Sequence, residues 1–276
     1  MSVARHRDLH DCVRCHPMSG PQISFNDVSR VFPDGTHAVD NVSLSVGAGE
    51  FVSIIGPSGC GKSTLLKMAS GLMEITGGSI DVDRTSIGYV FQDATLLPFR
   101  TVQRNVELFA ELHKMPKSEA SRLATEAIEL VGLKGFEKKF PKSLSGGMKM
   151  RASLARSLTL NPKVFLFDEP FGAIDEITRD RLNTELMQLF VRNQFAGLFV
   201  THSISEAVYL STRVLVMSAR PGRLIAEFEV PFEYPRTESI RYTPEFARLT
   251  GAVNDALHDA YSTIIRGTPL TTGLPT

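Results

Sequence analysis

Gly56-Pro57-Ser58-Gly59-Cys60-Gly61-Lys62-Ser63-Thr64 decides how the rest of this sequence is interpreted, because it matches the pattern G-x-x-x-x-G-K-[ST]. It follows the apolar run Phe51 to Ile55, which is typical of a strand buried on both faces of an α/β sheet. A helix is expected to begin near Lys62. Glycines let consecutive backbone N–H groups turn inward, and the helix N-terminus adds its dipole. The stretch therefore predicts a phosphate-binding loop.

All of residues 56–64 are candidate contacts for the phosphates of a nucleotide such as ATP. Lys62 is expected to reach the β and γ phosphates as a point charge, and Ser63 to ligate Mg²⁺ through its hydroxyl. Cys60 lies inside the loop, so thiol reagents are expected to block nucleotide binding.

Two carboxylates follow a second apolar run, Val164 to Phe167. Asp168 is expected to help hold Mg²⁺ at the end of a buried strand. Glu169 comes next and is placed to polarise an attacking water. A pair of acidic residues after apolar ones is a weak signal alone, but together with a phosphate-binding loop it predicts nucleotide hydrolysis.

A third motif, Leu144-Ser145-Gly146-Gly147-Met148, follows a helical region. One interpretation is an ordinary helix start capped by Ser145. The other is a second phosphate site, since backbone N–H groups beside Gly146 and Gly147 at a helix N-terminus suit an anion. A chain that has its own phosphate-binding loop needs a second site only if that site serves another subunit.

The remaining pattern alternates between short strands and helices. Strands are predicted from period-two alternation or buried apolar runs, and helices from apolar residues three and four apart. The predicted strands are Ile23 to Phe32, Val39 to Val46, two within Ser79 to Gln92, Gly197 to Thr201, and Leu224 to Val230 after an Arg220-Pro221-Gly222 turn. Helices are predicted within Thr101 to Leu160, at Thr178 to Arg192 and near Pro244 to Ile264.

With these motifs in this order, the sequence resembles an ABC transporter ATPase over about residues 20 to 235. The resemblance implies a P-loop NTPase of the ABC ATPase fold: an α/β protein with a mixed sheet core, an antiparallel β subdomain and an α-helical subdomain. Residues 56–64 match the Walker A loop, 164–169 match Walker B with its catalytic glutamate, and 144–148 match the signature motif.

Four shorter matches follow from the same resemblance. Gln92 matches the Q-loop glutamine that senses Mg²⁺ and the membrane partner, and His202 matches the catalytic switch histidine. Phe32 takes the place of the aromatic residue that stacks on adenine. Ala173-Ile174-Asp175 matches the D-loop, although Ile174 replaces the usual leucine. Met148 replaces the usual glutamine of the signature motif, which puts nucleoside contacts across an interface in doubt.

Three regions are expected along the chain of 276 residues. Residues 1–20 are expected to be a disordered tail or to contain a mis-assigned start, with Met18 as a second plausible start. Residues 21–235 form the ATPase domain, with a helical subdomain at about 93–160, and 236–276 form a helical extension. The apolar face of that extension, which includes Phe246, Val253 and Ile264, packs on its own domain or docks to a partner.

Composition narrows the partners. Lys and Arg together number 30, as do Asp and Glu. The chain therefore lacks the basic excess of a nucleic-acid binder, and no nucleic-acid partner is expected. No apolar run approaches the ~18 residues of a membrane span, and no secretory signal is evident. One short stretch, Cys12-Val13-Arg14-Cys15-His16, matches a haem-attachment pattern. Its two cysteines and His16, together with His10, are also suitable zinc ligands. The alternative is that these residues belong to a disordered tail.

The resemblance implies a homodimer that sandwiches two ATP molecules and drives membrane subunits. Residues 96–102, 170–173 and 218–222 resemble the nitrate, sulfonate and taurine importers. These importers imply permease subunits, an extracytoplasmic solute-binding protein, and a position on the cytoplasmic face of the membrane. The Leu96-Leu97-Pro98-Phe99 cluster is expected either to contact the permease or to be buried in the subunit. An exporter ATPase and an ABC ATPase acting on nucleic acid or ribosomes are the alternatives.

Overall fold

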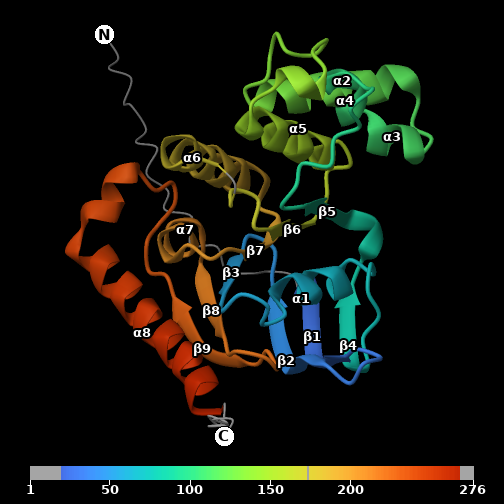
Figure 1. Ribbon diagram of the computed structural model, residues 1–276. Coiled ribbons are helices and arrows are strands. Elements are labelled where there is room, and N and C mark those ends of the chain that lie inside the picture. Colours follow the sequence, from blue (N-terminus) through green and yellow to red (C-terminus); the bar gives the residue numbers. More distant parts are fainter. Residues whose placement is uncertain (1–19, 173, 268–276) are drawn as a thin grey trace, which may run out of the picture.

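The computed structural model describes residues 20–172 and 174–267 (Figure 1). The expectations for residues 1–19, which include both N-terminal cysteines and Met18, and for Ala173 lie outside the described residues. Two sheets organise the described part. One has three strands and the other six, and the helices lie around them.

The smaller sheet is antiparallel and has the strand order β2-β1-β4. Its strands are β1 (Ile23–Val31), β2 (His37–Val46) and β4 (Gly77–Val82). Alternate residues of β2, among them Val42, Leu44 and Val46, are buried, as the period-two pattern predicts.

The larger sheet is mainly parallel and has the strand order β5-β6-β7-β3-β8-β9. Its strands are β3 (Phe51–Ile55), β5 (Ile87–Val90), β6 (Val164–Asp168), β7 (Ala196–Val200), β8 (Arg213–Met217) and β9 (Leu224–Glu229), of which only β9 is antiparallel to its neighbour. In a parallel sheet the carboxyl ends of the strands meet at one edge. The loops after β3, β6 and β7 therefore lie next to one another.

Two apolar cores, one on each face of the larger sheet, explain its continuous apolar strands. Phe51 and Ile55 of β3 belong to one core, whereas Val52 and Ile54 belong to the other. All five residues of β3 are buried, and Ser53 is satisfied by a hydrogen bond to the Ser211 hydroxyl at 2.5 Å. A strand covered on both faces needs apolar residues at nearly every position.

Helices lie in two groups. Against the larger sheet lie α1 (Lys62–Ala69), α6 (Glu176–Asn193), α7 (Ile204–Leu210) and α8 (Pro244–Gly267). The second group forms a separate helical body above β5 and β6 in Figure 1, made of α2 (Val102–Val106), α3 (Leu108–Leu112), α4 (Lys117–Leu130) and α5 (Gly146–Leu158). Short 3₁₀ turns lie at Arg84–Ser86, Pro141–Ser143 and Glu238–Tyr242.

The C-terminal helix packs on its own domain. Phe246, Val253 and Ala260 of α8 are buried, and α8 contacts α7, β8 and β9. Sequence analysis missed α7 and β8. The helix has only seven residues, which is too short for periodicity to identify it. The strand has an apolar run like that of β6, so its signal was present and was overlooked.

Candidate functional site

Glycine conformation shapes the loop between β3 and α1. Gly59 and Gly61 have φ angles of 74° and 107°, in the left-handed region that residues with a Cβ rarely adopt. A Cβ on Gly61 would also come within 2.7 Å of the Ala38 carbonyl oxygen. The loop can therefore take this tight path only with glycine at both positions. It leads into the N-terminus of α1, where the first backbone N–H groups of a helix lack partners within the helix.

The Lys62 ammonium group lies over the loop. Its Nζ donates to the carbonyl oxygens of Gly56 at 2.8 Å and Pro57 at 2.9 Å, and the side chain is buried. An open depression lies in front of the loop. It is lined by Phe32, Ala38, Ser58, Gly59, Gly61, Lys62, Ser63, Thr64, Glu169 and Arg220. The depression places a buried cation and a glycine cradle where a polyphosphate would fit.

Ser63 meets the first carboxylate across the sheet edge. Its hydroxyl donates to Asp168 Oδ1 at 2.7 Å, and the Tyr89 hydroxyl donates to Asp168 Oδ2 at 3.2 Å. Burial, together with the neighbouring Asp168 charge, raises the pKa of Tyr89 far above its usual range. Tyr89 therefore stays a donor and holds the carboxylate in place.

These oxygens suit Mg²⁺. A serine hydroxyl and a carboxylate are hard oxygen ligands, and Mg²⁺ usually takes one or two of them together with water and substrate phosphate. Among the described residues, no group of three or more His, Cys, Asp or Glu side chains could hold a metal ion. An ion at Ser63 and Asp168 would thus depend on the phosphates to complete its ligands.

Glu169 and His202 face each other at the ends of β6 and β7. The distance from His202 Nδ1 to Glu169 Oε2 is 3.3 Å, and the side chains are 57% and 24% exposed, respectively. Glu169 has a φ of 46°, an uncommon value for a residue with a side chain. Its N–H donates to the Val200 carbonyl at 2.9 Å, which ties the start of this loop to β7.

Three predicted loop residues lie behind the cradle. Gly56 and Pro57 contribute carbonyl oxygens to Lys62, while Cys60 is only 1% exposed. Burial raises the pKa of the Cys60 thiol. The expected reaction with thiol reagents is therefore slow, because the reactive thiolate is scarce.

The structure does not bring every predicted residue to the depression. Gln92 is exposed just after β5 and is not among the described residues that line the depression. Ser145 caps α5 by accepting from the Met148 N–H at 3.2 Å, as the interpretation of this motif as a helix start predicts; the cap is compatible with a phosphate site at the same helix end. Gly146 and Gly147 are the first two residues of α5, a helix of the helical body that lies away from α1 (Figure 1). One chain thus presents the two glycine motifs at different places.

Sequence analysis missed Arg220 and Tyr89, and also Ala38, which lines the depression. Arg220 lines the depression and donates to the Gly59 carbonyl from Nε at 3.2 Å and from Nη2 at 3.0 Å. It is 161 residues from Gly59 in sequence, so only folding brings them together. Tyr89 had no signal because it belongs to an ordinary buried strand. Phe32 does line the depression, with the Arg30 guanidinium 5.2 Å from its ring centre.

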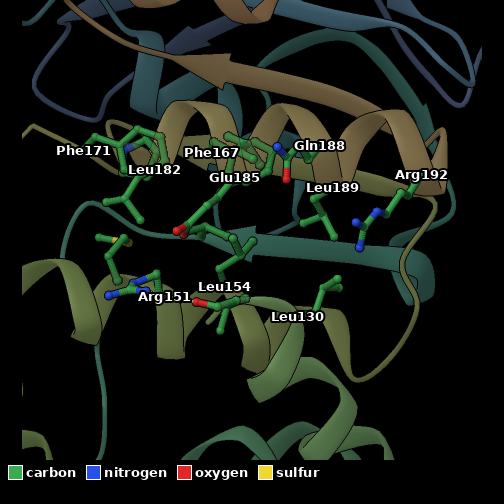
Figure 2. Close-up of a pocket in the computed structure, with 15 residues that line it drawn as sticks. Leu130, Arg151, Leu154, Phe167, Phe171, Leu182, Glu185, Gln188, Leu189 and Arg192 are labelled. Atoms are coloured by element: carbon green, nitrogen blue, oxygen red, sulfur yellow. Dashed lines mark hydrogen bonds between the residues drawn. The ribbon is translucent and has the colours of Figure 1, made fainter. Parts of the chain in front are cut away.

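A separate crevice lies between the helical body and the larger sheet. Figure 2 shows Arg151 and Leu154 of α5 facing Leu182, Glu185 and Leu189 of α6. Its volume is about 50 Å³, whereas an engineered cavity that binds benzene measures about 150 Å³. The crevice is a narrow gap lined by α5, α6 and the strand residues Val90 and Phe167, too small for a nucleotide.

Known proteins share this arrangement. A model of the ABC transporter family matches residues 39–172. The chain is 41% identical to the aliphatic sulfonates import ATP-binding protein SsuB of Bacillus cereus, over 79% of this chain and 89% of that protein. It is 40% identical to the taurine import ATP-binding protein TauB of Rhizobium johnstonii, over 80% of this chain and 89% of that protein.

A solved dimeric structure of the ATP-binding cassette MJ0796, in a post-hydrolysis state bound to ADP and Pi, has a TM-score of 0.68 and 31% identity. The match covers 76% of this chain and 99% of that one. No helix in the described part of this chain is long and apolar enough to cross a membrane. On the identity and coverage of these relatives, the chain belongs to the family of ABC transporter ATP-binding proteins.

Proposed function

We propose that this chain hydrolyses ATP to power the import of a small organic or anionic solute, of the sulfonate, taurine or nitrate type, through separate permease subunits. The observation that carries the ATPase proposal is the meeting of Lys62, Ser63, Asp168, Glu169 and His202 at one sheet edge. The importer proposal rests on the names of the relatives SsuB and TauB.

Binding comes first in the proposed mechanism. The backbone N–H groups of residues 58–64 and the Lys62 ammonium hold the phosphates, and Phe32 lies where it can stack on the base. Ser63 and Asp168 would hold Mg²⁺, which supplies charge neutralisation on the phosphates when bound. Gln92 is proposed to approach this ion only when its loop moves, because it is exposed after β5.

Hydrolysis then depends on the two residues at the ends of β6 and β7. Glu169 accepts a proton from the water whose oxygen attacks the terminal phosphorus, while the bond from that phosphorus to the bridging oxygen breaks and ADP leaves. His202 lies 3.3 Å from this carboxylate and orients it toward the water. The positive φ of Glu169 directs its side chain away from the strand and into the depression that it lines.

A second copy of the chain is proposed to complete each site. Ser145, Gly146 and Gly147 lie on the helical body and do not line the depression of their own chain. Ser145 and Gly146 are exposed at the N-terminus of α5, where N–H groups suit an anion. Two chains arranged head to tail would each present this helix start to the ATP of the other.

The permease is proposed to dock on the segment after Gln92. Phe99 is 74% exposed and borders a groove with Arg100, Arg104 and Phe140. Beneath it, the fully buried Asn105 bonds the backbone of Leu97, Arg100 and Thr101, while the Arg156 side chain bonds the carbonyls of Ala94 and Thr95. The loop is thus held rigid from within while it presents an aromatic ring outward, as a docking anchor requires.

Co-purification and transport test this proposal. The tagged chain should recover a multi-span permease from detergent-solubilised native membranes, placing it on their cytoplasmic face, and the reconstituted complex should hydrolyse ATP faster when solute-loaded binding protein is added. The Phe99→Ser variant should no longer co-purify with the permease but should keep basal hydrolysis. The Leu72→Ser variant, a control at a 62% exposed leucine, should keep both.

ATP-driven efflux would indicate an exporter instead. Recovery of ribosomal or DNA-repair proteins without a permease would refute transport.

A further inference from the structure

The inference concerns a buried network beside His202 and rests on the proposed ATPase function. Thr201 and Ser203 flank His202 and are bridged by one hydroxyl. Thr201 Oγ1 accepts from the Ser203 N–H at 3.0 Å and donates to Glu206 Oε2 at 2.6 Å. Thr201 is 2% exposed and Glu206 5% exposed. The backbone on both sides of His202 is therefore attached to one buried carboxylate.

Glu206 occupies a specialised place in α7. Ser203 caps this helix, and its hydroxyl accepts from the Glu206 N–H at 3.3 Å. In an ordinary capping box the glutamate bonds back to the N-cap N–H. Here the Thr201 hydroxyl accepts the hydrogen bond from the Ser203 N–H, and the Glu206 carboxylate accepts one from the Thr201 hydroxyl. The second carboxylate oxygen, Oε1, is left to face α6.

Arg179 of α6 meets that oxygen. Its Nε lies 3.7 Å from Glu206 Oε1, and its Nη2 donates to the Ile174 carbonyl at 2.8 Å. Ile174 is buried and directly precedes Asp175, the N-cap of α6. One guanidinium group thus joins the segment matched to the D-loop with the carboxylate that holds the His202 loop.

We propose that Arg179 and Glu206 are positioning residues that couple residues 174–175 to the orientation of His202, so that hydrolysis depends on where that segment lies. Glu206 is buried and forms an ion pair with Arg179, and removing either partner of a buried pair leaves an uncompensated charge. Displacement of the Ile174 backbone would therefore move Arg179, and through Glu206 the two residues that flank His202. Ile177, 86% exposed in the first turn of α6, shows that this segment lies at the surface, where a second subunit could move it.

Enzyme kinetics on the full chain test the coupling. Arg179→Met and Glu206→Gln should each lower kcat about tenfold while changing the KM for ATP less than twofold, because neither residue lines the depression. The double variant should lose no more than the worse single one, since both act through one contact. Arg179→Lys should recover part of the rate. Arg181→Met is the matched control on the same helix, where the 69% exposed Arg181 pairs with the half-buried Glu185, and it should match wild type.

A spectroscopic measurement without nucleotide completes the test. The side-chain NMR signal of His202, identified by its loss in His202→Ala, should shift in Arg179→Met and Glu206→Gln but not in Arg181→Met. Wild-type kcat with an unmoved His202 signal, or losses that simply multiply in the double variant, would overturn the coupling. If the wild-type chain fails to hydrolyse ATP, the proposed function fails, and the His202 signal alone then decides the positioning claim.

Discussion

At the scale of single residues, the site combines groups that the sequence places far apart. Asp168 and Glu169 are neighbours in the chain but face different partners: Asp168 bonds Ser63 and Tyr89, whereas Glu169 faces His202. The left-handed φ at Glu169 helps produce this divergence. This divergence fits the proposed division of roles, in which Asp168 would help hold Mg²⁺ and Glu169 would activate water.

Glu169→Gln should separate binding from hydrolysis. The amide keeps the shape of the side chain but cannot accept the proton, so turnover should fall about 100-fold or more. ATP should then hold the variant as a dimer, measured by size-exclusion chromatography with light scattering. Glu126→Gln, on an exposed ion pair of α4, is the control and should behave as wild type. Near-normal turnover would refute the assigned role of Glu169.

Cys60 should be alkylated slowly, and faster as pH rises. Burial raises the pKa of its thiol, so less thiolate is present at neutral pH than in a free cysteine, and the thiolate fraction increases as pH approaches the raised value. At pH 7.5 iodoacetamide should modify it at least about tenfold more slowly than free cysteine. Peptide mass spectrometry separates Cys60 from Cys12 and Cys15. Bound ATP should slow the reaction further, and equal labelling with and without ATP would contradict this.

At the scale of elements, the segment after β9 holds α7 in place. Arg236 is 3% exposed and donates to the carbonyls of Phe232, Val208 and Tyr209. Val208 and Tyr209 are in the last turn of α7, where carbonyl groups lack partners within the helix. Burial lowers the pKa of Arg236. The guanidinium group nevertheless donates hydrogen bonds to all three carbonyl oxygens. The extension thus stabilises the helix that follows His202.

Arg236→Met should destabilise the chain. It leaves the buried carbonyls without their charged donor, at a cost of about 3 kcal/mol in the free energy of unfolding. Arg248→Met, which breaks an exposed ion pair on α8, should cost less than about 0.5 kcal/mol. Urea denaturation followed by circular dichroism measures both. Equal stability of the two variants would show that the extension does not support α7.

At the scale of the whole molecule, the phosphate-binding loop and the signature motif lie on different bodies of one chain. A Cβ on Gly146 would meet open space, whereas one on Gly147 would lie 2.9 Å from Thr178 Cγ2. Gly146→Asp should therefore fold normally while adding a charge that repels the ATP of a partner. Gly147 could not be used in this way, because its substitution would disturb packing against α6.

Mixing two inactive variants tests the composite site. Lys62→Ala removes the phosphate contact of its own loop, and Gly146→Asp spoils the site of its partner. A heterodimer of the two has one spoiled site and one intact site. An equal mixture should recover roughly a quarter of wild-type ATPase activity if the sites act independently and dimers form at random. Activity no greater than that of the separate variants would mean that each chain completes its own site.

The sequence by itself determined the family, the order of the motifs and most strands. Glycine spacing and buried apolar runs are local signals, since they arise from backbone φ angles and from burial on both faces of a sheet. It also placed Lys62 at the start of a helix, and Asp168 and Glu169 at the end of a buried strand, where the structure has them. Short elements such as α7 escaped, because seven residues carry too little periodicity.

Only the tertiary structure decided which distant residues meet. Arg220 reaches Gly59, and Arg179 reaches Glu206, through contacts between elements that no local pattern encodes. It also showed that Phe99 points outward while Cys60 is buried. Strand order is the physical reason: β6, β7 and β3 are neighbours in the sheet although they are distant in the chain, so their loops converge at one edge.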